Sequence, residues 1–174
     1  MNRGRARIAT PVLCIAVAAL CCSPSHAGPA AASHCAAGET VVFSCAARGK
    51  TISVCGSRDL ADTASYIQYR FGEEDRTEIS LPRDPASWRS VVRSGVMTFA
   101  GGGGAYLTFA NPPYRYVVYT AIGRGWGEKA GVAVEQGGKR IASYRCGKPV
   151  TSLIGPDLFA TAGVPPDDAG FDLP

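Results

Sequence analysis

Four cysteines constrain the fold of this chain more strongly than any other feature of its sequence. The chain has seven cysteines in 174 residues, and three of them fall within residues 1–27. That segment has the order of a removable export signal. The four cysteines outside it are Cys35, Cys45, Cys55 and Cys146. An even number of cysteines in an exported domain predicts two disulfides, so we expect a covalently closed framework.

The export signal is predicted from three consecutive features. Residues 1–7 contain three arginines and no acidic residue, residues 8–22 form an apolar run, and Ser25-His26-Ala27 supplies small residues for cleavage. The apolar run is 15 residues long, shorter than the ~20 residues that a spanning helix needs. We therefore expect the segment to be cleaved and the rest of the chain to be exported, with no integral membrane span. A lipid anchor is disfavoured because Leu20, which is not small, precedes Cys21.

The exported chain is predicted to have three parts and to be periplasmic or secreted. They are a flexible leader over residues 28–33, a β domain over 34–148 and an acidic extension over 149–174. Loss of the three signal arginines leaves 15 basic and 14 acidic residues, a balance that does not suggest a nucleic-acid partner. The extension has four aspartates and no basic residue. We expect it either to pack on the mildly basic body or to leave a basic face for an anionic partner.

Short alternating segments between glycine-containing turns predict an all-β fold, a small antiparallel barrel or sandwich with two disulfides. The expected strands are 39–47, 50–55, 66–71, 77–81, 96–100, 106–110, 114–122, 131–136 and 139–146. Residues 82–94 are predicted to be a loop, and Gly101–Gly104 with Ala105 a turn. A short C-terminal helix is expected to begin at Pro156 and to end at Gly163.

The expected hairpin register separates the cysteines onto two faces. A two-residue turn at Arg48-Gly49 places Cys45 opposite Ile52 on the inward face, whereas Cys55 points outward. Four cysteines allow three pairings, and the sequence alone does not choose among them. The strand faces favour a bridge between Cys45 and Cys146, which leaves Cys35 for Cys55.

Catalytic residues are scarce in the predicted mature chain. His34 is its only histidine, so a Ser-His or Cys-His pair or a multi-histidine metal site has few groups to draw on. The cysteines have no Cys-x-x-Cys spacing that would indicate redox catalysis. We therefore expect no enzyme activity, no metal and no cofactor. The alternative is an envelope glycan hydrolase with two catalytic carboxylates. Its candidate acids are Glu73, Glu74, Asp75, Glu128 and Glu135.

The segment Gly123–Gly127 is the strongest candidate for a binding loop. Its glycines enclose Arg124 and Trp126, residue types that often anchor interfaces, and Lys129 follows closely. The competing interpretation is that Trp126 folds back over the end of the β domain. We favour a non-enzymatic binding module whose partner is an envelope protein or polymer. A structural or toxin-neutralising periplasmic protein is a further alternative.

Several strings resemble those of a group of small, uncharacterised exported proteins of Gram-negative bacteria. They are Gly38–Cys45, Ser53-Val54-Cys55, Tyr66–Gly72 and Tyr116–Tyr119. This resemblance implies an envelope or secreted location and no particular mechanism.

A second resemblance is to the membrane-bound and periplasmic inhibitors of C-type lysozyme, which are small β-barrels. The matching segments, in order, are Phe43-Ser44-Cys45, Gly103–Tyr106, Tyr116–Tyr119, Ala133-Val134-Glu135 and Cys146. The resemblance implies a lysozyme as partner, with Tyr106 in the inhibitory hairpin. Two features depart from the family: a glycine replaces the inhibitory serine, and the Trp-x-Lys-Gly segment is absent. Trp126-Gly127-Glu128-Lys129 lies close to where that segment is expected.

Overall fold

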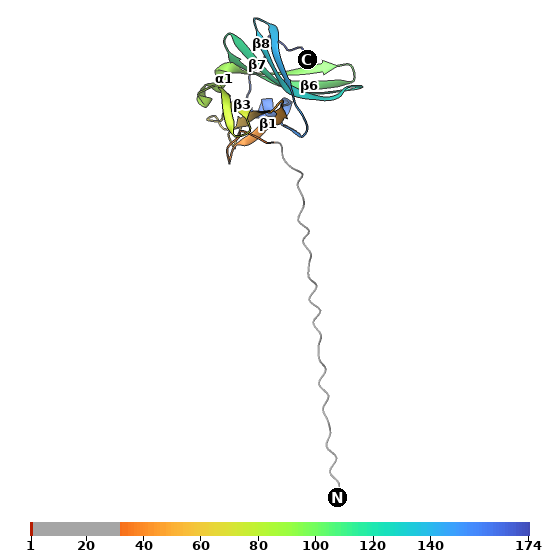
Figure 1. Ribbon diagram of the computed structural model, residues 1–174. Helices are drawn as coiled ribbons and strands as arrows, with labels where there is room; N and C mark the ends of the chain where they lie inside the picture. The colour runs from red at the N-terminus through yellow and green to blue at the C-terminus, as the bar shows by residue number, and fades with distance from the viewer. Residues whose placement is uncertain (2–31) are drawn as a thin grey trace.

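Two five-stranded antiparallel sheets form the β domain (Figure 1). The computed structural model describes Met1 and residues 32–174; the rest of the predicted signal peptide and leader residues 28–31 lie outside the described residues. The first sheet has the order β10-β1-β2-β3-β4, with β1 Thr40–Ala47, β2 Lys50–Gly56, β3 Ile67–Glu73, β4 Arg76–Leu81 and β10 Val150–Ser152. The second has the order β5-β6-β7-β8-β9, with β5 Val92–Phe99, β6 Gly102–Asn111, β7 Tyr114–Gly123, β8 Gly127–Gln136 and β9 Lys139–Arg145. The all-β prediction is confirmed, as a sandwich.

The first hairpin has the register that its turn predicts. Cys45 lies opposite Ile52 and Phe43 lies opposite Val54. Arg48 and Gly49 both have positive φ angles, of 51° and 75°, as a two-residue hairpin turn between twisted strands requires. The alternating faces of these strands therefore place Phe43 and Cys45 in the core.

The two disulfides join Cys45 to Cys146 and Cys35 to Cys55, which confirms the favoured pairing. Cys45 is on β1, whereas Cys146 directly follows β9, so this bridge connects the two sheets. Cys35 precedes β1 and holds the N-terminal part of the described chain against Cys55 of β2. One disulfide thus closes the sandwich, and the other fixes a segment on its outside.

The core between the sheets is filled by aromatic and branched side chains, including Phe43, Ile52, Tyr69, Leu107, Phe109, Val118 and Val132. Residues 82–94, predicted to be a loop, instead contain a 3₁₀ turn at Pro85–Ser87, the helix α1 at Trp88–Val91 and the start of β5. The side chain of Trp88 is fully buried, and its Nε1 donates to the carbonyl oxygen of Ser65 at 2.6 Å. Burial of this ring explains why the segment is ordered: an indole covers a large apolar area once its N–H has an acceptor.

The run of four glycines is not the turn that was predicted. Only Gly101, with a φ of +77°, lies in the turn, and β6 begins at Gly102. A Cβ on Gly102 would lie 2.1 Å from the carbonyl oxygen of Ile122, and one on Gly104 would lie 2.6 Å from that of Thr120. These glycines are therefore part of the strand because β7 approaches too closely for a side chain.

The acidic extension is part of the β domain. Val150–Ser152 pair with β1, and α2 runs over Pro156–Ala162 with Gly163 ending it at a φ of +61°, as predicted. The following residues reach the edge of the second sheet, where Ser94 and Pro166 form a parallel bridge. The extension packs on the body, which is the first of the two outcomes expected from its charge. Among the described residues, no helix is long and apolar enough to cross a membrane.

Removing the inter-sheet disulfide should destabilise the protein more than removing the other one. The bridged cysteines are 101 residues apart in the first case and 20 in the second. The chain-entropy model values these closures at about 5 and about 3 kcal/mol. We expect Cys45→Ala with Cys146→Ala to unfold at a lower urea concentration than Cys35→Ala with Cys55→Ala. An equal or reversed order of the two midpoints would contradict this ranking.

Candidate functional site

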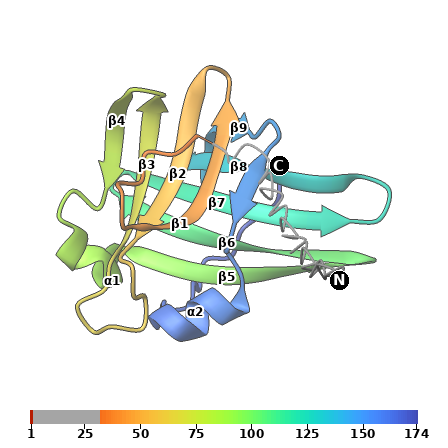
Figure 2. The ribbon, with the colours of Figure 1, turned by 90° about the horizontal axis from the view of Figure 1, so that it is seen from below.

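The strands of the second sheet cross those of the first steeply and extend beyond them at one end (Figure 2). This distal end contains the β5–β6 turn at residues 100–101 and the β7–β8 turn at residues 124–126. The two turns are neighbours, since the backbone N–H of Arg124 donates to the oxygen of Gly101 at 3.0 Å. At this end, the described strands of the first sheet do not cover the inner face of the second sheet completely (Figure 2).

A groove of about 740 Å³ occupies this incompletely covered face. The lining includes Val96, Gly103, Ala105, Thr120, Ile122, Glu128, Ala130, Val150, Ile154 and Pro156. Residues 103–105 of β6, 120–122 of β7 and 128–130 of β8 form the floor, and most of those on β6 and β7 are small. The segment from β10 to the start of α2 forms the opposite wall. Small floor residues between two packed elements leave space that larger side chains would fill.

The groove gathers large apolar side chains that remain exposed to solvent. Val96 is 61% exposed, Ile122 is 60% exposed and Val150 is 36% exposed. Isolated exposed apolar residues are ordinary on protein surfaces, but several that line one concavity indicate a binding surface. At the rim, Lys148 Nζ lies 3.1 Å from a carboxylate oxygen of Glu128. Both side chains are largely exposed, so this ion pair contributes little to the stability of the groove rim.

Three of the four predicted binding residues lie at the distal end. Trp126 is 37% exposed, with its ring edge-on to Phe99 at a centroid distance of 5.9 Å. Lys129 Nζ lies 5.2 Å from the centroid of the Trp126 ring and donates to the backbone oxygen of Pro174 at 2.9 Å. Within residues 32–174, the Arg124 side chain forms no hydrogen bond or ion pair. Trp126 thus folds partly back onto the sheet while part of its ring faces solvent.

Tyr106, the fourth predicted residue, lies elsewhere and is buried. It is 3% exposed, on the outer face of the second sheet, where its ring contacts that of Phe171 at 5.4 Å between centroids. Its hydroxyl donates to Asp167 at 3.0 Å. Burial and this hydrogen bond raise the pKa of Tyr106 to about 12. The C-terminal segment therefore covers Tyr106, and the segment Gly103–Tyr106 is strand interior rather than a protruding hairpin turn.

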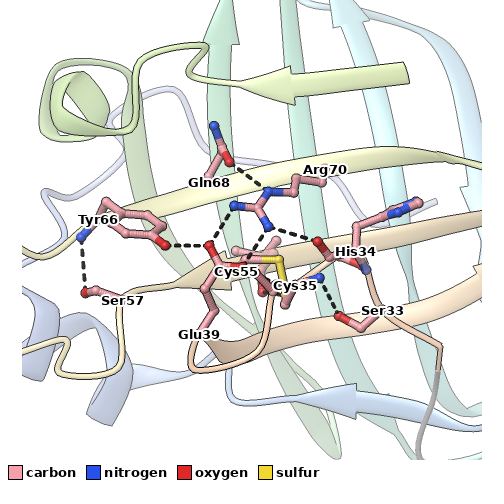
Figure 3. Close-up of polar contacts among 12 residues, drawn as sticks. Ser33, His34, Cys35, Glu39, Cys55, Ser57, Tyr66, Gln68 and Arg70 are labelled. Atoms are coloured by element: carbon pink, nitrogen blue, oxygen red, sulfur yellow. Dashed lines mark hydrogen bonds and ion pairs between the residues drawn. A yellow bond between two sulfur atoms is a disulfide. The ribbon is translucent and has the colours of Figure 1, made fainter. Parts of the chain in front are cut away.

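A polar cluster lies on the outer face of the first sheet, around the Cys35–Cys55 disulfide (Figure 3). Arg70 of β3 donates to both carboxylate oxygens of Glu39 at 2.7 Å, to Gln68 at 2.7 Å and to the carbonyl oxygen of His34 at 2.8 Å. Tyr66 also donates to Glu39. Bidentate pairing of this kind fixes geometry as well as charge. The cluster holds the segment before β1 against the sheet, next to the Cys35–Cys55 disulfide.

The arrangement of this cluster does not suit metal binding or catalysis. Cys35, Glu39 and Cys55 bring possible ligand atoms within 4.8 Å of one another. However, the two sulfurs are bonded to each other, and the Glu39 carboxylate accepts hydrogen bonds from three groups. His34 Nε2 is buried without a hydrogen-bond partner among the described residues. The backbone of His34, rather than its imidazole, takes part in the cluster.

Two of the acidic residues proposed for glycan hydrolysis, Glu128 and Glu135, do not form a catalytic pair. These residues are seven positions apart on the single strand β8, which corresponds to roughly 23 Å at ~3.3 Å per residue. Catalytic carboxylates of glycosidases are about 5 to 9.5 Å apart. Glu135 instead pairs with Arg115 at 2.5 Å, and Arg115 also pairs with Asp167 at 2.5 Å.

Of the residues that line the groove, Lys129 was predicted from the sequence as a binding residue, whereas Val96, Ile122 and Val150 were not. The signal of the groove floor is the run of small residues 103–105, which lies opposite residues 120–122 of the next strand. That pattern becomes visible only when the register between β6 and β7 is known. The exposed positions Val96 and Ile122 look like ordinary buried strand residues in the sequence.

Stability should depend on pH through Glu39. Burial alone would raise its pKa, but hydrogen bonds from Arg70, Tyr66 and the Ala36 amide outweigh burial and lower it. A carboxylate with a lowered folded-state pKa contributes stability above its unfolded pKa, and that stability is lost as the pH falls through the folded value. We therefore expect Glu39→Gln to be less stable than wild type at pH 7 and to lose less stability between pH 5 and pH 3. Urea unfolding across this range measures the effect.

Glu74→Gln is the matched control for this experiment, because Glu74 is exposed and outside the cluster. It should reproduce the pH dependence of the wild type. A Glu39→Gln curve parallel to the wild-type curve below pH 5 would contradict the assignment.

Similarity to known proteins does not indicate a function for this chain, so the function is inferred from the geometry of the site. No family model, curated protein or solved structure matches the chain. The groove, its exposed apolar side chains and the basic residues around it are therefore the basis for a functional assignment.

Proposed function

We propose that this protein is a non-enzymatic binding module of the periplasm or the extracellular space. The groove at the distal end of the second sheet binds an apolar part of an envelope protein or polymer. The observation that carries the proposal is the convergence of Val96, Ile122 and Val150, all exposed, on one concavity. Covering these side chains would remove apolar surface from water, the main favourable contribution in most associations.

The charges around the groove favour a partner with acidic groups. Arg145 at the end of β9 and Lys148 at the rim also line the groove, and Arg124 and Lys129 lie at the distal end. Glu128 is the acid among the lining residues, and it already pairs with Lys148. A partner carboxylate could replace Glu128 in that exposed pair at small cost. Such charges contribute mainly to the association rate and to the choice of partner.

The chemistry of the described residues supports binding over catalysis. The pKa of Glu39 and that of Glu73 are both lowered by their basic partners, although burial opposes the shift at Glu39. A general acid needs the opposite shift. The single histidine of residues 32–174 contributes its backbone to a structural cluster. Two disulfides also support export to an oxidising compartment.

A charge inside the groove should abolish partner binding. We expect Ile122→Asp to recover at least tenfold less partner than wild type from envelope extracts, because docking would bury an unpaired carboxylate. Ile141→Asp is the matched control, since Ile141 is 54% exposed but lies outside the groove. Quantitative mass spectrometry of the recovered material gives the ratio. Equal recovery by Ile122→Asp and wild type would overturn the proposal.

The distal turn is tested separately with Arg124→Ala combined with Trp126→Ala. If the turn contributes contacts, this double variant should recover less partner than wild type while retaining its thermal midpoint. Recovery equal to that of wild type would remove both residues from the binding site and leave the groove as the only contact.

A lysozyme is one candidate for the envelope partner. If it is the partner, a stoichiometric excess of the purified protein should slow lysis of cell walls by a C-type lysozyme. Ile122→Asp should then inhibit less than Ile141→Asp. Unchanged lysis rates with C-type and other lysozymes would exclude these enzymes as partners.

A further inference from the structure

One edge of the second sheet is already paired with an added strand over part of its length. The edge strand β5 directs the backbone N–H and C=O of Ser94 outward, away from β6. The N–H of Ser94 donates to the oxygen of Pro165 at 2.8 Å, and its oxygen accepts from the N–H of Asp167 at 2.8 Å. The C-terminal segment therefore runs parallel to β5 at this point, which shows that the edge can accept another strand.

The same edge is open further along β5. Strand geometry repeats every two residues, so Val96 and Thr98 also direct their backbone groups outward. Among residues 32–174, no other group forms a hydrogen bond with these outward amides and carbonyls. The C-terminal segment has left the edge by then, because Phe171 lies over Tyr106 and Tyr119.

The open part of the edge lacks the features that usually block strand addition. Residues 95–99 are Gly-Val-Met-Thr-Phe, without a charged residue or proline. Their register with β6 runs without a bulge from Val92 to Phe99. Exposed, regular and uncharged edges of this kind readily pair with another chain.

We propose that the partner presents an extended polypeptide segment, which adds to β5 as a new edge strand beside Val96 and Thr98. This inference rests on the proposed binding function and specifies the partner as a protein. Val96 points into the groove, and alternate side chains of a neighbouring strand lie on the same face. Every second side chain of the segment therefore enters the groove beside Val96 and is apolar. Backbone hydrogen bonds supply affinity, and the groove supplies selectivity.

The charges at the distal end define one end of the segment. Arg124 lies at the turn next to Gly101, beyond the last residue of β5, and its guanidinium has no partner among the described residues. An acidic residue of the segment meets Arg124 there. The preferred segment thus combines alternating apolar side chains with a carboxylate at the end nearest Phe99.

A second copy of this chain fits the edge less well than a foreign segment. The symmetric antiparallel register that pairs Val96 with Thr98 of the copy is centred on Met97. It places Ala100 of the copy beside Ser94. That position is taken by Pro165–Asp167 of the C-terminal segment. A foreign segment can end before this position.

The test compares Thr98→Pro with Thr98→Val. Proline removes the outward amide while leaving the hydrogen bonds to β6, and an edge strand tolerates it on its solvent side. Valine retains the amide. The probe is a synthetic peptide selected on the wild-type protein from a random dodecapeptide display library. We expect its Kd to rise at least tenfold for Thr98→Pro and less than threefold for Thr98→Val.

Two measurements keep the test independent of the folding of Thr98→Pro. Hydrogen exchange of the Val96 and Thr98 amides should slow when the peptide binds wild type. N-methylation of every second peptide amide should weaken binding when the methylated amides face β5 and leave it unchanged when they face away. The inference would be overturned if neither set of N-methylated amides weakened binding or if the protected amides lay elsewhere. Failure of the library to yield a peptide would overturn it as well. A wild-type dimer that Thr98→Pro dissociates in analytical ultracentrifugation would overturn it in favour of self-association.

The outcomes also separate this inference from the proposed function. If Ile122→Asp loses the envelope partner while Thr98→Pro retains it, the groove binds without strand addition, and only the inference is wrong. If both variants retain the partner, the proposed function is wrong as well. Loss in both variants, with the peptide results above, supports both.

Discussion

The disulfide between Cys45 and Cys146 sets the positions of the elements that follow it. It ties β1 of the first sheet to the end of β9 in the second. Next to it, Gly147 donates to the oxygen of Ala46 at 2.8 Å and Cys146 to that of Ala130 at 2.9 Å. The chain is therefore held between the sheets as it leaves β9, and it continues as β10 along β1. The wall of the groove begins at this covalent junction.

Features set by local rules could be predicted from the sequence. The Arg48-Gly49 turn fixed the register of the first hairpin, and the register placed Cys45 inward and Cys55 outward. Opposite faces then favoured the disulfide pairing that the structure has. Pro156 and Gly163 marked the ends of α2 for equally local reasons, a preset φ at the start and a left-handed φ at the end.

Features that depend on contacts between distant segments could not be predicted. Gly102 and Gly104 look like turn residues until the close approach of β7 is known. Tyr106 alternates like a surface aromatic residue, but Phe171 covers it from 65 positions further along the chain. Prediction of the groove would need still more information, because the groove depends on how far the second sheet extends past the first. Of the predicted binding residues, Arg124, Trp126 and Lys129 come together because their turn is local, whereas Tyr106 lies apart.

The small residues of the groove floor differ in how strongly the fold depends on them. Gly104 is fixed by neighbouring backbone atoms, and Ala105 and Ala130 belong to the core, whereas Thr120 is only partly buried and lines the groove without a side-chain hydrogen bond among the described residues. A change of one or two carbon atoms at Thr120 would alter the depth of the groove and leave the strand register intact. A single substitution at this position can thus change which side chains such a module accepts, while the core residues beside it keep the fold.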